Sequence, residues 1–148
     1  MSKYIHKSHN VTVLMYHIVC PVKYRRAIFT DKVDEELREI CIEISKRYEV
    51  NFLEIGVDKD HAHFLVQSVP NYSPRQIVQT IKSHTAREIF KRVPEVKEFL
   101  WGGAFWTSRY FVTTVSRNGN EETIQKYVKG QGREQEYKRL HQSQLSLF

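Results

Sequence analysis

The chain has 148 residues, of which 41% are hydrophobic, and it carries a formal net charge of +6 at pH 7. That length suits one domain with one core, and the absence of any long apolar run in the sequence excludes a membrane-spanning helix. The positive charge favours an acidic partner such as nucleic acid, although a basic protein without such a partner has the same balance.

The chain opens with a predicted strand and a predicted helix. Residues 11–19 are rich in β-branched and aromatic side chains and are followed by Pro21, which predicts a central strand. Residues 31–48 place apolar side chains at helical spacing opposite a charged face, with Thr30 as the expected N-cap.

A hairpin and a second helix come next. Residues 52–57 and 61–69 predict two strands joined by the Asp-rich turn at 58–60. Ser73-Pro74-Arg75-Gln76 has the pattern of a capping box and opens a helix that we expect Pro94 to stop.

The last elements complete the fold prediction. Residues 105–115 predict an aromatic strand, and a final helix is expected at about 120–138, followed by a polar tail. The first six elements have the βαββαβ order of an α+β, ferredoxin-like fold, an antiparallel sheet with helices on one face. We therefore expect a single domain over residues 1–148.

Cys20 and Cys41 have no close spacing, and they make neither a CxxC pair nor a zinc knuckle. Each stands in an apolar pattern, so we expect two buried thiols in a reducing compartment. The polar, His-rich segment 1–10 has no signal-peptide pattern, and together these features predict a cytoplasmic protein.

His61-Ala62-His63 is the first candidate for chemistry. Residues two apart on a strand point to the same side, so both imidazoles can reach one ion while Ala62 enters the core. A pair of surface histidines would have the same sequence. Asp58 and Asp60 either orient the imidazoles or serve only the turn, and the pattern favours the turn.

Tyr127 and Gln131 are the second candidate, four residues apart and so on one face of the last helix. A tyrosine hydroxyl can act as a nucleophile, and a glutamine oxygen can bind a hard metal, although Tyr127 could instead be a core aromatic. Two imidazole nitrogens and one amide oxygen leave positions open for a phosphate oxygen. Such a set suits Mg²⁺ or Mn²⁺.

Basic and aromatic side chains form the third candidate. Lys82, Arg87, Lys91 and Arg92 predict a basic exposed side of the second helix, which could contact DNA. Aromatic residues crowd the stretch from Trp101 to Phe111, and we expect most of them in the core rather than stacked on bases.

The ordered combination of these motifs resembles TnpA, the single-tyrosine HUH transposase of the smallest bacterial insertion sequences. His61-Ala62-His63 is similar to the HUH motif, and the later segments are Leu100-Trp101-Gly102-Gly103-Ala104-Phe105-Trp106, Tyr110-Phe111-Val112, and Tyr127 with Gln131. The similarity extends from Val11 to about Gln131.

The resemblance implies a homodimer that acts on single-stranded DNA and recognises hairpins at the ends of an insertion sequence. Tyr127 would attack the DNA to give a 5′-phosphotyrosine and a free 3′-OH. His61, His63 and Gln131 would bind Mg²⁺ or Mn²⁺, and the tyrosine helix of one subunit could complete the site of the other.

Two other functions fit the same residues. One is a non-catalytic nucleic-acid-binding module on the same fold, which would bind without a divalent metal. The other is a domesticated HUH nuclease that acts on chromosomal repeats. A zinc hydrolase is disfavoured, because no further His or Cys cluster completes a zinc site in the sequence.

Overall fold

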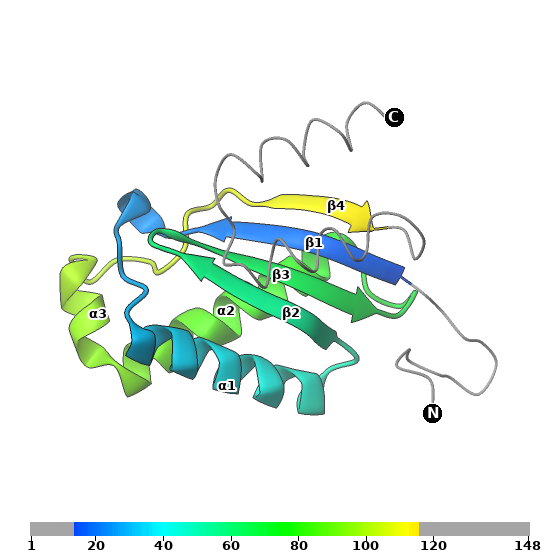
Figure 1. The fold of residues 1–148 in the computed structure, drawn as a ribbon, viewed down its shortest axis with the longest axis horizontal. Helices are drawn as coiled ribbons and strands as arrows, with labels where there is room; N and C mark the ends of the chain where they lie inside the picture. Colours follow the sequence, from blue (N-terminus) through cyan, green and yellow to red (C-terminus); the bar gives the residue numbers. More distant parts are fainter. Residues whose placement is uncertain (1–13, 116–148) are drawn as a thin grey trace.

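The computed structural model describes residues 14–115, which form a four-stranded antiparallel sheet with helices on one face (Figure 1). The strands are β1 (Leu14–Pro21), β2 (Asn51–Asp58), β3 (His61–Ser68) and β4 (Phe111–Val115). The helices are α1 (Asp31–Arg47), α2 (Pro74–Arg92) and α3 (Pro94–Phe99), with a 3-10 helix η1 (Lys23–Arg25). The strand order β2-β3-β1-β4 confirms the predicted ferredoxin-like arrangement.

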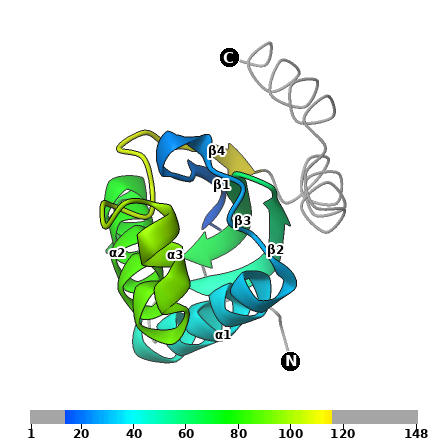
Figure 2. The same cartoon turned by 90° about the vertical axis from the view of Figure 1, so that its left-hand side faces the viewer.

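The core lies between the sheet and the helices. Because side chains alternate along a strand, Ile18 and Cys20 of β1 and Ala62, Phe64 and Val66 of β3 all face α1 and α2. In Figure 2 the two long helices lie together on one side of the sheet, where their apolar stripes cover these residues. Both cysteines are buried, as predicted, and burial raises the pKa of the Cys20 thiol to about 12.

Local capping determines where the long helices begin. The hydroxyl of Thr30 accepts a hydrogen bond from the Val33 amide at 3.3 Å. At α2, Ser73 Oγ accepts from the Gln76 amide at 3.1 Å, and Gln76 Oε1 accepts from the Ser73 amide at 2.8 Å. Both caps were predicted from the sequence, because the signal for a cap is local.

The structure corrects the sequence prediction after α2. Pro94 follows the end of that helix as expected, but it also begins α3, since proline is well suited to the first helical turn. The predicted strand at 105–115 is shorter, and only Phe111–Val115 is a strand. Phe105 and Trp106 are buried in the preceding segment, where Trp106 forms a single antiparallel bridge with Val22 rather than a continuous strand.

The first strand extends further than the predicted end at residue 19, since β1 continues to Pro21. The predicted last helix at about 120–138 lies outside the described residues. None of the helices within residues 14–115 is long and apolar enough to cross a membrane.

Candidate functional site

The two histidines of the HUH pattern lie side by side at the start of β3. His61 is paired with Pro21 of β1, and His63 with Val19, on the sheet face away from α1 and α2. Their ring centroids are 4.8 Å apart, with an angle of 67° between the ring planes. Alternation along the strand therefore brings both imidazoles to one place, as the sequence predicted.

This sheet face is more enclosed than the sequence suggested. The sequence was also compatible with a pair of surface histidines, but His63, Leu65 and Gln67 all have 0% exposed surface. Burial, followed by the nearby His17 and His61, holds the pKa of His63 well below its usual range. His63 is therefore neutral at physiological pH, which is the form that binds metals.

Asp60 holds the ring of His61. The Nδ1–H of His61 donates to Oδ1 of Asp60 at 2.7 Å, and Nε of Arg25 donates to Oδ2 at 2.8 Å. Burial acts to raise the pKa of Asp60, but the hydrogen bonds and charges of Arg25 and His61 outweigh it and lower the pKa. The sequence favoured a turn role for this residue, and the structure shows it as the acceptor that orients an imidazole.

Asp58 fits the turn role better. Its Oδ1 accepts a hydrogen bond from the Lys59 amide at 2.8 Å, whereas its Oδ2 lies 3.9 Å from Nε2 of His61. A separation of 3.9 Å is too long for a hydrogen bond. The two aspartates of the turn therefore differ in function although they are two residues apart.

His17 is a member of the site that sequence reasoning missed. This β1 residue is buried, and its Nε2 lies 3.2 Å from Nδ1 of His63, with the two rings stacked at 15°. For His63 to bind an ion through Nε2, its Nδ1 must carry the proton and donate it to His17. In the sequence, the alternation of His17 with Ile18 places these two side chains on opposite faces of the strand. Only the register between β1 and β3 shows that His17 lies beside His63.

The residues present fit a divalent metal. Nδ1 of His61 is engaged by Asp60 and Nδ1 of His63 by His17, so each ring would offer Nε2 to an ion. Within residues 14–115, no group of three His, Cys, Asp or Glu side chains is placed to hold a metal. The predicted third ligand Gln131 and the predicted nucleophile Tyr127 lie outside the described residues.

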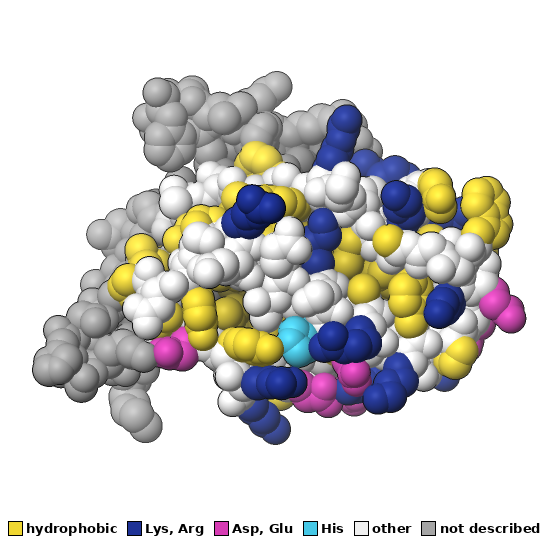
Figure 3. All heavy atoms as spheres, turned by 180° about the vertical axis from the view of Figure 1, so that it is seen from behind, with side chains coloured by type: hydrophobic (Ala, Val, Ile, Leu, Met, Phe, Trp, Pro, Cys, Tyr) yellow, Lys and Arg dark blue, Asp and Glu magenta, His cyan; other side chains and the backbone are white. Residues whose placement is uncertain are grey.

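The basic residues of α2 do not form a uniform exposed row. Lys82 Nζ donates to the carbonyl of Thr107 at 2.7 Å, and Arg92 forms ion pairs with acidic side chains. Arg87 and Lys91 remain exposed. The carboxylates around Arg92 are Glu36, Glu39, Glu43 and Glu88. Figure 3, which views this side of the molecule, shows acidic and basic side chains intermingled along its lower edge.

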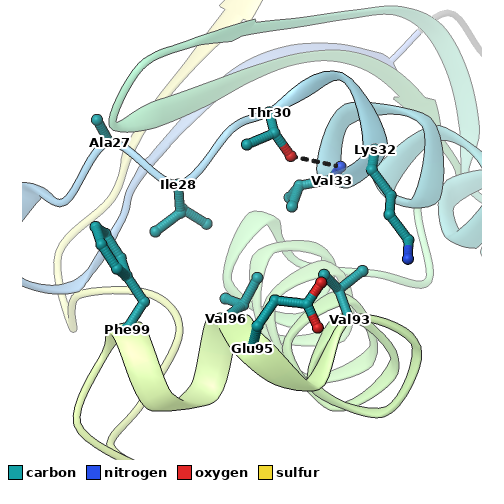
Figure 4. Close-up of a pocket in the computed structure, with 9 residues that line it drawn as sticks. All are labelled: Ala27, Ile28, Thr30, Lys32, Val33, Val93, Glu95, Val96 and Phe99. Carbon is teal, nitrogen blue, oxygen red and sulfur yellow. Dashed lines mark hydrogen bonds between the residues drawn. The ribbon is translucent and has the colours of Figure 1, made fainter.

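A cavity of about 260 Å³ lies on the helix side, away from the histidines. Figure 4 shows Ile28, Val33, Val96 and Phe99 around it, from the segment leading into α1, from the first turn of α1 and from α3. Its lining is mainly apolar and contains no candidate metal ligand pair, so the cavity is separate from the HUH site.

Comparison with known families identifies the chain. The model of the family described as "Transposase IS200 like" matches residues 10–131, which is most of the sequence. The chain therefore belongs to the IS200-like transposase family.

Individual relatives agree with this family. The chain is similar to the ISDra2 transposase TnpA of Deinococcus radiodurans, at 34% identity over 80% of this chain and 84% of the relative. It is 28% identical to a transposase for insertion sequence element IS200 of Salmonella typhimurium, over 78% of this chain and 75% of the relative.

Solved structures show the same fold. A structure of a transposase from Deinococcus radiodurans R1 has a TM-score of 0.69 and 29% identity, covering 86% of this chain and 98% of that one. A REP-associated tyrosine transposase bound to a REP hairpin has a TM-score of 0.56 at 12% identity, over 86% of this chain and 70% of that one. At that identity the second likeness concerns the fold alone.

Proposed function

We propose that this transposase cleaves and rejoins single-stranded DNA through a 5′-phosphotyrosine on Tyr127, with Mg²⁺ or Mn²⁺ bound by His61, His63 and Gln131. The observation that carries the proposal is the pair of adjacent imidazoles on the sheet face away from the helices, each fixed through Nδ1. Membership of a transposase family supports the DNA chemistry.

The residues supply distinct parts of the reaction. Oη of Tyr127 attacks the phosphorus, the P–O3′ bond breaks, and the 3′ oxygen takes up a proton to balance the one that the phenol loses. A bound divalent ion would act as a Lewis acid on the scissile phosphate. The phosphotyrosine conserves the energy of the broken bond, so a 3′-OH can reverse the attack and join a new strand.

His63 and His61 keep the site ready for this reaction. Burial keeps His63 neutral, so no proton has to be displaced before an ion binds at neutral pH. The ion pair from Arg25 to Asp60 fixes the acceptor that orients His61. The first feature keeps His63 in the neutral form that binds a metal, and the second keeps the ring of His61 in place before DNA binds.

The proposed substrate is a hairpin near each end of an insertion sequence, and the proposed assembly is a homodimer. Both follow from the family resemblance, and the hairpin-bound structure cited above has the same fold. The last helix would then bring Tyr127 and Gln131 to the histidines together, within one subunit or across the dimer.

The deciding experiment incubates the protein with labelled single-stranded DNA from the flanks of its own gene. We expect a covalent adduct on a denaturing gel with Mg²⁺, none in EDTA, and none for Tyr127→Phe, which should still bind the hairpin. An adduct that persists in Tyr127→Phe contradicts the nucleophile. Binding without cleavage in any divalent metal supports the non-catalytic module instead.

A mixing experiment tests the dimer. His61→Ala and Tyr127→Phe are each expected to be inactive alone. If the helix of one subunit completes the site of the other, the mixture forms adduct on the His61→Ala subunit. If each site is built from one chain, the mixture stays inactive, and sedimentation of the wild type gives the oligomeric state.

A further inference from the structure

Three exposed aromatic rings and one arginine form a cluster at the end of the sheet where β1 ends. Tyr24, Phe99 and Trp101 expose 57%, 48% and 72% of their surface. The guanidinium carbon of Arg26 lies 4.6 Å from the centroid of the Trp101 ring and 5.2 Å from that of Phe99. The centroids of Tyr24 and Trp101 are 5.4 Å apart. We call these four residues the aromatic platform.

The backbone beneath the platform is held in an unusual conformation. Tyr24, Arg25 and Trp101 have φ angles of 61°, 53° and 56°, and they are the three non-glycine residues with positive φ within residues 14–115. Such conformations are unfavourable for L-residues with large side chains and persist where the surroundings enforce them, often at binding sites. Their concentration at one surface is a second observation, independent of the exposed rings.

Trp101 stands where a helix usually ends in glycine. The Gly102 amide donates to the Lys97 carbonyl at 2.7 Å and the Trp101 amide to the Glu98 carbonyl at 2.9 Å. This is the Schellman pattern, in which the left-handed residue after the helix is most often glycine. A large exposed indole at that position is unfavourable for the backbone and adds little to the core.

The platform is joined to the histidine site through Asp60. The Val22 amide donates to the Asp60 carbonyl at 2.8 Å, and the next residues form η1. Arg25 of η1 binds the Asp60 carboxylate, which in turn binds His61. A strand of DNA that reaches the histidines can therefore lie across η1.

The chemistry of the platform suits an unpaired base. Aromatic faces and a guanidinium stack on any base, whereas a duplex hides its base faces. Lys23, Arg25 and Arg26 give this loop three basic side chains in four residues, which suits the adjoining phosphates. The same end of the molecule shows hydrophobic and basic side chains side by side at the right of Figure 3.

We propose that the aromatic platform stacks an unpaired base of the single-stranded DNA next to the scissile phosphate, with Trp101 as the main contact. This inference rests on the proposed function, because it names the part of the substrate that lies beside the same metal site. A protein surface could also cover exposed rings, but the basic loop favours a polyanion.

Trp101→Gly is a sharp test, because glycine suits the left-handed backbone and the lost ring is mostly exposed. We expect its melting temperature to equal or exceed that of the wild type. Its affinity for labelled single-stranded flank DNA, measured by fluorescence anisotropy in EDTA, should be weaker by about 10-fold. Trp101→Phe should keep most of the affinity. Ile42→Ala, at another exposed apolar side chain, is the matched control and should bind normally.

A scan of abasic positions along the oligonucleotide locates the stacked base. One abasic position beside the cleavage site should weaken binding of the wild type and leave binding of Trp101→Gly unchanged. DNA binding should also quench the fluorescence of Trp101, while Trp106 is buried and should respond little.

The outcomes separate this inference from the proposed function. If the wild type forms the covalent adduct and Trp101→Gly binds DNA as tightly as the wild type, the platform is not a base site while the transposase chemistry stands. A change in oligomeric state with unchanged DNA affinity also overturns the inference and indicates a protein contact. If DNA binding weakens as expected but no adduct forms in any metal, the base site stands and the catalytic proposal fails.

Discussion

The carboxylate of Asp60 binds two side chains, Arg25 and His61, that are far from each other in sequence. Asp60 accepts from His61 on one oxygen and from Arg25 on the other, so the ring and the η1 loop are fixed by the same carboxylate. Partners of metal-binding histidines set the tautomer and the ring orientation, and losing them commonly weakens metal binding by about 10- to 100-fold. A substitution at Arg25 should therefore weaken metal binding at the proposed site of His61 and His63.

His84 on α2 provides a pH-dependent contribution to stability. Tyr48 Oη lies 2.9 Å from its Nε2 and an Arg87 nitrogen 3.0 Å from its Nδ1. Burial, then Arg87 and Arg47, lower its pKa below the usual 6.5, while Glu88 acts in the opposite direction. The folded state thus binds this proton less tightly than the unfolded chain, so the stabilisation is complete above pH 6.5 and is lost as the pH falls below it.

We expect His84→Gln to flatten this dependence. Between about pH 7.5 and about pH 5, the melting temperature of the wild type should fall more than that of His84→Gln. Calorimetry of the two proteins across this range is the measurement, with Ser83→Ala as a neighbouring control. Parallel curves for wild type and His84→Gln would falsify the assignment.

At the scale of elements, the start of α2 rests on two reciprocal hydrogen bonds between Ser73 and Gln76. Ser73→Ala removes the hydroxyl that accepts from the Gln76 amide, and we expect it to lower the free energy of unfolding by about 1 kcal/mol. Urea denaturation measures the change. Ser83→Ala, in the exposed middle of the same helix, should change stability by less than about 0.5 kcal/mol. Equal effects at the two serines would contradict the capping role.

Arg92 joins the two long helices. Its guanidinium lies 2.7 Å from a carboxylate oxygen of Glu43 and 3.3 Å from one of Glu36, both on α1, and 3.2 Å from one of Glu88 on its own helix. We expect Arg92→Gln to lower the free energy of unfolding by roughly 1 kcal/mol, because it leaves these carboxylates facing one another.

Salt and a neighbouring arginine provide the controls for Arg92. The loss should shrink in high salt, because screening weakens both the attraction and the repulsion between partly exposed charges. Arg87→Gln should affect stability less, since the described contact of Arg87 is with His84 rather than with a carboxylate. If Arg92→Gln leaves stability unchanged and weakens DNA binding, the original expectation of a DNA contact is the better one.

The elements that could be predicted from the sequence are those with local signals. The four residues from Ser73 to Gln76 indicate where a helix begins. The alternation of side chains around His61 predicts a strand and shows which residues share a face. By contrast, Pro94 can stop one helix or start another, and only packing decided that it does both. The partnership of His17 with His63 spans 46 residues and depends on strand register, which no local pattern fixes.

Over the whole molecule, the two sides of the sheet have separate tasks. The side facing α1 and α2 holds the main core, and the opposite side presents the histidines. His61→Ala should therefore leave the core intact. Phe64→Ala, at a core residue that is 0% exposed, should lower the free energy of unfolding by about 3–5 kcal/mol.

Metal binding should be visible as added stability. A ligand that binds only the folded state raises the melting temperature in proportion to the logarithm of its concentration. We expect Mn²⁺ to raise the melting temperature of the wild type and to leave that of His61→Ala unchanged. Differential scanning fluorimetry across a Mn²⁺ titration is the measurement, with Ca²⁺ for comparison. An equal rise in both proteins would mean that the ion binds elsewhere.

The turn between β2 and β3 limits how this protein can change over generations. Only Lys59 and Asp60 separate the two strands, and Asp60 is hydrogen-bonded to the first residue of β3. Because side chains alternate, a shift of β3 by a single residue would turn the imidazoles toward the helices. It would also bring Ala62 and Phe64 to the sheet face away from α1 and α2. A gain or loss of one codon that shifted the strand would disturb the core and the histidine pair together, so we expect descendants of this gene to vary at Lys59 and hardly ever at Asp60 or in the length of the turn.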